Sequence, residues 1–258
     1  MSCPNFQYFR VVPIYKQPNM DVKNMTGDHY RKTAIIVGVL FITATAVSLV
    51  DMALLGTSLD GPDYLLGLPE VEDRMGVSVI LELVLAVSLI GIGALMYPVF
   101  KRHGEGMAVT YAGLRLTEAV FVIVATTCIL LMLTMGGDYA DGTLEGDSVE
   151  ATGALLKGLR DWTFLIGTLI FLGLGALTLN YLLYVSSLVP RWLSVWGLIG
   201  GAGVLVYGIL GIFGLDTNAA DASSLLAAPI AMQEMVFASY LIIKGFRTPA
   251  GGQAPSGQ

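Results

Sequence analysis

Charged side chains inside apolar segments are the residues of this sequence whose types could do chemistry. Four carboxylates and one guanidinium fall in such segments: Asp51, Glu82, Arg115, Glu118 and Glu234. An ionised group at the centre of a bilayer costs about 2.5 to 3.5 kcal/mol on insertion scales, so such groups normally face the interior of a helical bundle and are paired. These five residues are therefore the first candidates for a functional cluster.

Arg115 and Glu118 are the clearest pair, because a spacing of three places both side chains on one face of a helix. Glu234 lies near the middle of a later apolar segment, beside Gln233, which supplies hydrogen-bond donors and an acceptor. With Glu82, these residues form the predicted intramembrane polar cluster. We expect Glu118 and Glu234 to share Arg115, which favours a proton on one carboxyl. The alternatives are a buried ion pair that fixes helix register, and a relay or ligand site for a proton or ion.

A second group of charges stands at the start of the fourth apolar segment. It contains Lys157, Arg160 and Asp161, and Asp51 is expected at a similar depth near the end of the first segment. Charged residues beside an aromatic residue such as Trp162 are typical of a membrane interface, which favours an anchoring role. The alternative is an outer mouth that selects an anionic group.

Six apolar blocks must position these side chains, and each is long enough to cross a hydrocarbon core about 30 Å thick. They cover residues 34–55, 77–99, 108–134, 162–186, 192–215 and 225–245. Backbone groups in lipid must be paired within a helix or a closed barrel, and the blocks lack the alternation of barrel strands. All six are therefore predicted to be helices, and a surface helix starting near Asp147 is expected to lead into the fourth.

The predicted fold is all-α: a polytopic membrane protein with a six-transmembrane-helix bundle over residues 34–247. A disordered arm is expected over 1–33 and a disordered tail over 248–258. Composition agrees, since 55% of the 258 residues are hydrophobic and 13% are charged, against roughly 25% charged in a soluble domain. The net charge of −6 argues against a nucleic-acid partner, which needs clustered Lys and Arg. The lipid bilayer is the expected partner, with a proton or a small solute at the polar cluster.

Basic residues divide unevenly between the two sides of the predicted bundle. Placing alternate connections on opposite sides gives ten on one side and three on the other. The ten are Arg10, Lys16, Lys23, Arg31, Lys32, Lys101, Arg102, Arg191, Lys244 and Arg247, and the three are Arg74, Lys157 and Arg160. Because basic loops stay on the cytoplasmic side, both termini are predicted to be cytoplasmic in a protein of the cytoplasmic membrane.

Glycine is frequent in the fifth block, which contains a GxxxG pair at Gly197 and Gly201. Glycine lets helices approach closely in lipid, where apolar burial no longer drives association. Packing within the bundle is the primary interpretation, and a homo-oligomer formed through this face is the alternative. Gly91-Ile-Gly93 and Gly173-Leu-Gly175 look like fragments of a dinucleotide-binding motif, but no strand precedes them, so they too are predicted to be packing glycines.

Cofactor and enzyme motifs are missing from the sequence. His29 and His103 fall on predicted cytoplasmic segments, so no span offers the histidines that a haem or a catalytic zinc uses. There is no GxSxG, HExxH, phosphate-loop or CxxC motif. We expect no cofactor and no metal. An embedded enzyme with Glu118 or Glu234 as general base is one alternative to transport, and a structural or regulatory membrane subunit is the other.

Three runs of the sequence carry a resemblance to a known family. They are Arg115-Leu-Thr-Glu118, Pro190-Arg-Trp-Leu-Ser194-Val-Trp-Gly-Leu-Ile-Gly200, and Glu234 followed by Lys244-Gly-Phe246. Together they look like the six-helix membrane family catalogued as domain of unknown function 4386, over about residues 31–247. That family has an Arg-x-x-Glu in its third span and a Glu in its last, so the resemblance adds weight to Arg115, Glu118 and Glu234. It implies the fold and names no substrate.

Overall fold

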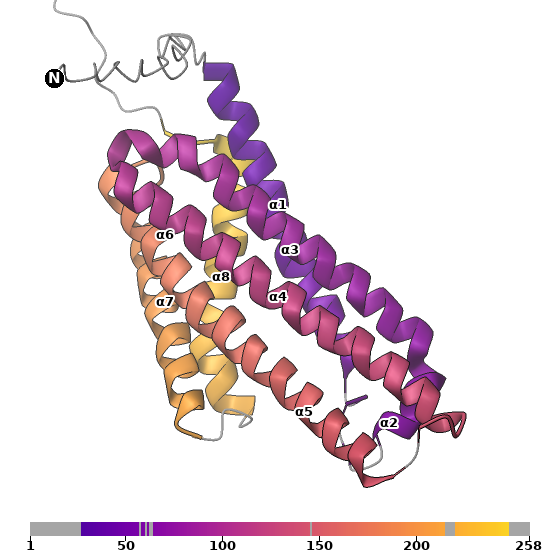
Figure 1. Ribbon diagram of the computed structural model, residues 1–258. Coiled ribbons are helices and arrows are strands. Elements are labelled where there is room, and N and C mark those ends of the chain that lie inside the picture. The colour runs from indigo at the N-terminus through magenta and orange to yellow at the C-terminus, as the bar shows by residue number, and fades with distance from the viewer. Residues whose placement is uncertain are drawn as a thin grey trace, which may run out of the picture.

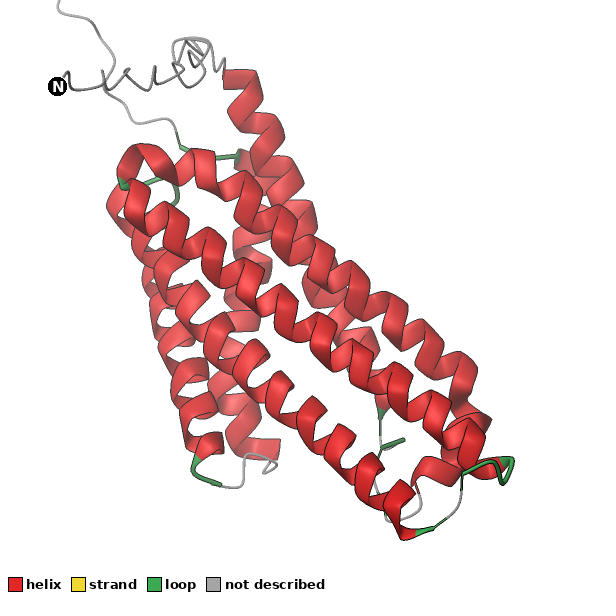
Figure 2. Cartoon of the chain, in the orientation of Figure 1, coloured by secondary structure: helices red, strands yellow, loops and turns green. Residues whose placement is uncertain are grey.

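Helices account for all the regular structure that the computed structural model describes (Figure 1; Figure 2). The described residues are 27–56, 58–59, 61, 64–144, 146–214 and 220–247. Most of the predicted arm and the whole predicted tail lie outside them. The first helix begins at Gly27, so the last residues of the stretch expected as an arm are helical.

The long helices stand at the predicted blocks. They are α1 (Gly27–Leu55), α3 (Glu72–Phe100), α4 (Glu105–Ala140), α5 (Asp147–Phe164), α6 (Leu172–Ser186), α7 (Arg191–Ile212) and α8 (Ala220–Lys244). The short ones are α2 (Tyr64–Gly67), η2 (Leu68–Val71) and η3 (Lys101–His103). The helix of the fourth block starts at Asp147, as predicted, and continues from α5 through the π-helical segment η4 (Leu165–Phe171) into α6.

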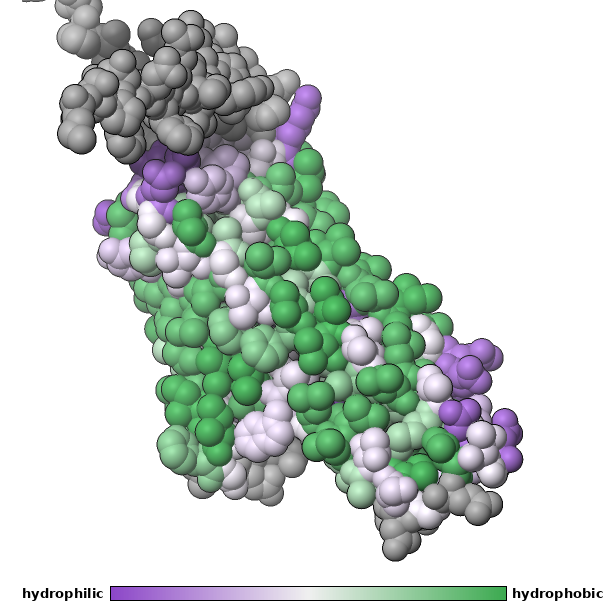
Figure 3. Space-filling model, in the orientation of Figure 1, coloured by the Kyte–Doolittle hydropathy of each residue, from purple (hydrophilic) through white to green (hydrophobic). Residues whose placement is uncertain are grey.

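Five helical segments of the described residues are long and apolar enough to cross a membrane. They are Tyr30–Leu55, Tyr64–His103, Glu105–Ala140, Ser148–Ser186 and Arg191–Ile212. Figure 3 shows apolar residues covering the middle of the molecule, with hydrophilic residues gathered toward its two ends. The chain is therefore an all-α protein with the apolar helices of a membrane-embedded protein. At the sixth predicted block, α8 packs against α1 and α7.

The helices form two groups. One contains α1, α3, α4 and α5, the other contains α6, α7 and α8, and contacts of α1 with α8 and of α4 with α6 join them. The end that holds the start of α1, η3 and the α6–α7 turn carries Lys101, Arg102 and Arg191 and is called the basic end here. The end that holds α2 and the α4–α5 turn is called the acidic end. In Figure 1 the two groups diverge toward the acidic end.

The apolar core is divided along the bundle. The largest cluster brings together α1, α3, α4, α6, α7 and α8 toward the basic end, where the rings of Phe41 and Phe237 meet edge to face with centroids 5.4 Å apart. At the acidic end, Leu65 and Leu68 pack against Met132 of α4. The six helices are thus held together most extensively near the basic end.

Arg31 closes the ring of helices between α1 and α8. Its guanidinium donates hydrogen bonds to the backbone oxygens of Leu241 at 3.2 Å and Ile242 at 2.7 Å, in the last turn of α8. Carbonyls at a helix C-terminus lack partners within the helix and carry partial negative charge, so a cation there satisfies both needs. Gly245 follows with φ of +72°, a conformation that ends the helix and favours glycine.

Glycines make the close helix contacts that the sequence predicts. A Cβ atom added at Gly197 would clash with the side chain of Asn180 on α6, and one added at Gly173 would lie 2.8 Å from the Cβ of Leu205 on α7. Side chains at these positions would force α6 and α7 apart. The packing role is thereby confirmed for both glycines, and association of copies through α7 stays a prediction.

Candidate functional site

Three charged side chains meet inside the bundle and are called the central charge set. The guanidinium of Arg115 on α4 donates through Nη1 to Oε2 of Glu118 at 2.9 Å and through Nη2 to Oε1 of Glu234 on α8 at 3.2 Å. The predicted pairing of Arg115 with both carboxylates is present. The set joins the two groups of helices and has a formal charge of −1 when all three residues are ionised.

The central charge set is almost fully removed from the surface. The side chains of Arg115, Glu118 and Glu234 are 2%, 6% and 12% exposed. The Nε of Arg115 donates to the hydroxyl of Tyr111 at 3.1 Å, and the guanidinium lies 5.4 Å from the ring centroid of Phe41 on α1. Aromatic faces stabilise a cation where water is excluded. Every nitrogen of the guanidinium therefore has an acceptor, and its face has an aromatic neighbour.

Gly93 of α3 makes room for Arg115, because a Cβ atom added there would lie 3.1 Å from the Cβ of Arg115. Gly175 of α6 lies near as well, since a Cβ atom added there would be at an ordinary contact distance of 3.9 Å from Nε of Arg115. Together with Phe41 on α1 and Glu234 on α8, these glycines surround the side chain. Arg115 on α4 thus lies among residues of four other helices, which makes it a central packing element as well as a charge.

Gln233 faces a different part of the bundle, although it precedes Glu234. Its Nε2 donates to Oδ1 of Asn180 on α6 at 3.1 Å and to the backbone oxygen of Leu193 on α7 at 3.2 Å. Consecutive residues on a helix point about 100° apart, since 3.6 residues complete a turn. Gln233 therefore links α6, α7 and α8, and the structure does not bring it into the central charge set.

The structure places Glu82 in a second charge set, with Arg160 and Asp51. The guanidinium of Arg160 on α5 donates to Oε1 of Glu82 on α3 at 3.0 Å, and the hydroxyl of Thr126 on α4 donates to Oε2 of Glu82 at 2.6 Å. The hydroxyl of Ser78 donates to the carboxylate of Asp51. Two expectations are corrected: Glu82 does not join Arg115, and Arg160 turns inward instead of remaining at an outer mouth.

An apolar layer separates the two charge sets. Ala86 and Leu89 of α3 and Ala119 and Val122 of α4 form a buried cluster between the levels of Glu82 and Glu118. Glu118 belongs to the central charge set, and Thr126 binds Glu82 of the second set. These two residues stand eight positions apart on α4, a rise of about 12 Å at 1.5 Å per residue. The sets are therefore stacked along the bundle at two depths.

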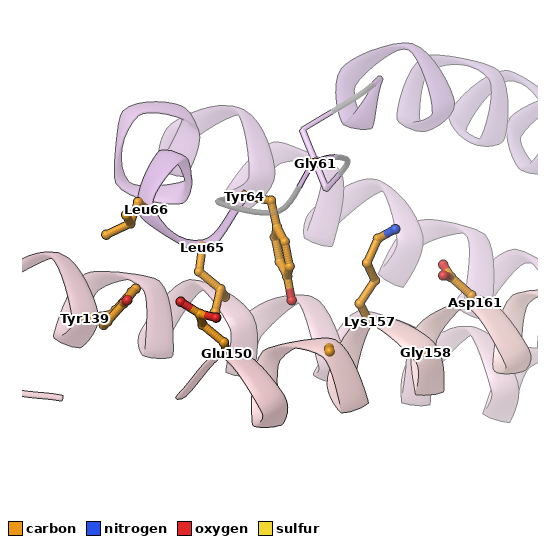
Figure 4. A pocket seen from close by; sticks show the side chains of 10 residues that line it. Gly61, Tyr64, Leu65, Leu66, Tyr139, Glu150, Lys157, Gly158 and Asp161 are labelled. Atoms are coloured by element: carbon orange, nitrogen blue, oxygen red, sulfur yellow. The ribbon is translucent and has the colours of Figure 1, made fainter. Parts of the chain in front are cut away.

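Lys157 and Asp161 line a recess at the acidic end, together with Glu150, Tyr64 and Tyr139 (Figure 4). Its volume is about 430 Å³, and it lies between α2, the end of α4 and α5. Of the residues predicted to form an outer mouth, these two thus border an open cavity. The other two, Arg160 and Asp51, belong to the second charge set.

Several polar and aromatic partners of the charge sets have little or no signal in the local sequence. Tyr111 carried a local signal, because it precedes Arg115 by four residues and shares its helical face. Thr126 stands two turns after Glu118 on α4, a weaker signal. Phe41 and Asn180 lie on other helices, and their local sequence does not indicate that they contact Arg115 and Gln233. Among the described residues, no three His, Cys, Asp or Glu side chains gather in a way that could hold a metal ion.

The fold and these buried charge sets define a helical membrane protein with ionisable groups inside its bundle. Comparison with known proteins gives its family: a model described as a domain of unknown function, DUF4386, matches residues 36–245, and the chain belongs to this family. No curated protein and no solved structure matches it. The membership expected from the Arg115, Glu118 and Glu234 pattern is confirmed.

Proposed function

We propose that this protein handles a proton or a small solute inside the membrane through the central charge set. The observation that carries the proposal is the charge count, because two buried carboxylates, Glu118 and Glu234, share the single guanidinium of Arg115. One proton on either carboxyl brings the set to neutrality, and a buried net charge is costly. Gain and loss of that proton would be the elementary step of a relay or of coupled solute movement.

The second charge set supports the proposal, because it repeats the same ratio nearer the acidic end. Asp51 and Glu82 are two carboxylates near one guanidinium, that of Arg160. A proton that moves between the two sets must cross the apolar layer, about 12 Å along α4. Direct hydrogen bonds do not span that distance, so transfer requires water to enter between α3 and α4. In this proposal the layer is the barrier that a conformational change opens.

The proposal includes six spans in the cytoplasmic membrane, with both termini in the cytoplasm. The basic end holds Lys101, Arg102, Arg191 and Lys244, while Arg74 and Lys157 belong to the other end. Basic residues near the ends of spans are retained on the cytoplasmic side. The orientation is measured with single cysteines at positions 103 and 142: an impermeant reagent added outside should label position 142 alone. Labelling of 103 from outside would invert the topology.

Flux in liposomes tests the functional proposal. The Glu118→Gln and Glu234→Gln variants keep the side-chain shapes and remove the exchangeable proton, so each should abolish proton flux that the wild-type chain supports. Glu105→Gln is the matched control, because Glu105 is an exposed residue at the basic end that pairs with Lys101. Undiminished flux in the Glu118→Gln, Glu234→Gln double variant would contradict the proposal.

A structural subunit is the second candidate, and the contacts of Arg115 favour it. Each nitrogen of the guanidinium has one acceptor, and the side chain lies among residues of α1, α3, α6 and α8. Such an ion pair can serve only to fix the register of the helices. The two candidates differ in one result: if an Arg115→Leu, Glu118→Leu double variant folds and wild-type flux persists in it, the set is structural.

A further inference from the structure

The recess at the acidic end has the composition of a ligand site. We propose that it binds a small organic cation, an ammonium group attached to a short apolar body. The site lies apart from both charge sets, and binding there does not require that the protein transport anything. Its volume of about 430 Å³ falls within the range of small-molecule pockets, roughly 300 to 1,000 Å³.

The wall opposite α5 is held in place by packing. Leu65 is 4% exposed and belongs to the core of the acidic end. A Cβ atom added at Gly153 of α5 would lie 2.6 Å from Cδ1 of Leu65 and 3.0 Å from the hydroxyl of Tyr64. The absence of a side chain at Gly153 therefore lets α2 lie directly against α5. The recess is a built feature of the fold and not a gap beside a loose loop.

Charge in the recess favours a cation. Glu150 and Asp161 make no ion pair with any other residue of the described chain, and Lys157 is the one basic residue among those that line the recess. Arg160 would cancel this excess of negative charge, but its guanidinium is bound to Glu82 at 3.0 Å. The lining residues that the structure describes therefore have a formal charge of −1.

Aromatic rings and leucines complete the chemistry. In Figure 4 the side chain of Tyr64 points toward α5, with Glu150 on one side of it and Lys157 and Asp161 on the other. An ammonium group gains from both a carboxylate and the face of a tyrosine ring, while Leu66, which is 48% exposed, supplies apolar contact for the rest of the ligand. A lone metal ion fits poorly, because Glu150 and Asp161 are eleven residues apart on α5, about 16 Å, and cannot share one ion.

Calorimetry with three matched probes tests the inference on the purified full chain in nanodiscs. The probes are protonated phenethylamine, neutral 2-phenylethanol and anionic 3-phenylpropanoate, which share a ring and differ in charge. We expect saturable binding of the amine, about tenfold tighter than that of the alcohol, and weaker binding still of the carboxylate. Equal binding of amine and alcohol, tighter binding of the carboxylate, or no saturable heat with the amine would each overturn the inference.

Variants then assign the binding to the recess. Glu150→Gln combined with Asp161→Asn should weaken amine binding about tenfold, and both residues are exposed, so the fold should be retained. Lys157→Met, which removes the opposing positive charge, should tighten it. Glu105→Gln at the basic end is the control and should change nothing. Amine binding that survives unchanged in the double variant would overturn the inference.

The Glu118→Gln, Glu234→Gln double variant separates this inference from the proposed function. It leaves the recess intact, so it should bind the amine as the wild type does, even if its proton flux is lost. Flux in the wild type without amine binding would refute ligand binding at the recess and leave the proposed function standing. Amine binding by a chain whose flux is insensitive to Glu118 and Glu234 would refute the proposed function alone.

Discussion

The two charge sets contain the same groups and differ in what surrounds them. In the central set, Arg115 is 2% exposed, packs under the ring of Phe41 and joins α4 to α8. In the second set, Arg160 is 11% exposed, and the neighbouring carboxylates accept hydrogen bonds from the hydroxyls of Thr126 and Ser78. Each set thus has two carboxylates for one guanidinium. In the central set they are surrounded by aromatic and glycine contacts, and in the second set by small hydroxyl groups.

This difference indicates different tolerances to change. A hydroxyl rotates to suit a new partner, and a group near the end of the bundle can be reached by water. The guanidinium of Arg115 has less of both, because its hydroxyl partner, Tyr111, is fixed by a buried ring and its own side chain is only 2% exposed. We therefore expect equivalent substitutions to be more damaging in the central set.

Removal of Arg115 should produce the largest effect. Arg115→Leu leaves Glu118 and Glu234 buried without their cation, which should lower the free energy of unfolding by about 3 to 5 kcal/mol unless the carboxyls take up protons. Chemical unfolding in detergent measures the loss. Adding Glu118→Leu and Glu234→Leu removes the uncompensated charges, so the triple variant should recover most of the stability.

Arg191→Leu provides the control for that series, since Arg191 is an exposed arginine at the basic end. It should change the unfolding free energy by less than about 0.5 kcal/mol. If Arg115→Leu is as stable as the wild type at every pH, the three charges are not coupled.

Arg160→Leu makes the same chemical change in the second set and should cost less, about 2 kcal/mol. Glu82 keeps the hydroxyl of Thr126 at 2.6 Å, and Arg160 starts from a less buried position. Unfolding of the two arginine variants under identical conditions gives the comparison directly. A loss equal to that of Arg115→Leu would show that depth and surroundings do not distinguish the sets.

A glycine substitution tests whether the uncharged contacts between α6 and α7 are also tightly packed. Gly197→Ala would bring a methyl group into the side chain of Asn180, so overpacking should cost about 1 to 3 kcal/mol. Gly113→Ala is the matched control, because a Cβ atom there meets nothing within 4 Å. The control should be neutral or slightly stabilising, since alanine favours a helix over glycine. Equal effects of the two changes would refute tight packing of α6 on α7.

Single hydrogen bonds compare the two sets at smaller cost than the removal of Arg115. Tyr111→Phe keeps the ring but leaves Nε of Arg115 without its acceptor, for a loss of about 2 kcal/mol. Thr126→Val removes one donor to Glu82, whose other oxygen retains Arg160, for a loss of about 1 kcal/mol. Thermal unfolding of both variants ranks them. The reverse order would show that the second set is the more rigid of the two.

Local spacing predicted the part of the site that one helix supplies. Arg115 and Glu118 are three residues apart, so their pairing follows from helical geometry alone. The pairing of Glu234 with Arg115 was predicted from its depth, because Glu234 lies near the middle of the last apolar block, where a charged group is expected to be paired. The early start of α5 was also visible, in the helical pattern that begins near Asp147.

Contacts between helices do not follow from the spacing of residues within one helix. Arg160 was expected at an outer mouth because the apolar run resumes only at residue 162, yet in the fold it reaches Glu82 on α3. The sequence does not reveal the tilt of α5 and the π-helical turns that follow it. Gln233 likewise was grouped with its neighbour Glu234, and only the packing of α6 and α7 shows that it points toward Asn180.

Glu118 and Glu234 should together carry one proton beside Arg115. Infrared spectroscopy of the purified protein at neutral pH tests it most directly, because a protonated carboxyl absorbs apart from an ionised one and shifts in heavy water. We expect absorption from protonated buried carboxyls in the wild type, unchanged in Glu105→Gln and clearly reduced in the Glu118→Gln, Glu234→Gln double variant, where only the second charge set still contributes. A wild-type spectrum in which every carboxyl of the bundle is ionised, or carboxyl absorption of undiminished intensity in the double variant, would refute the shared proton.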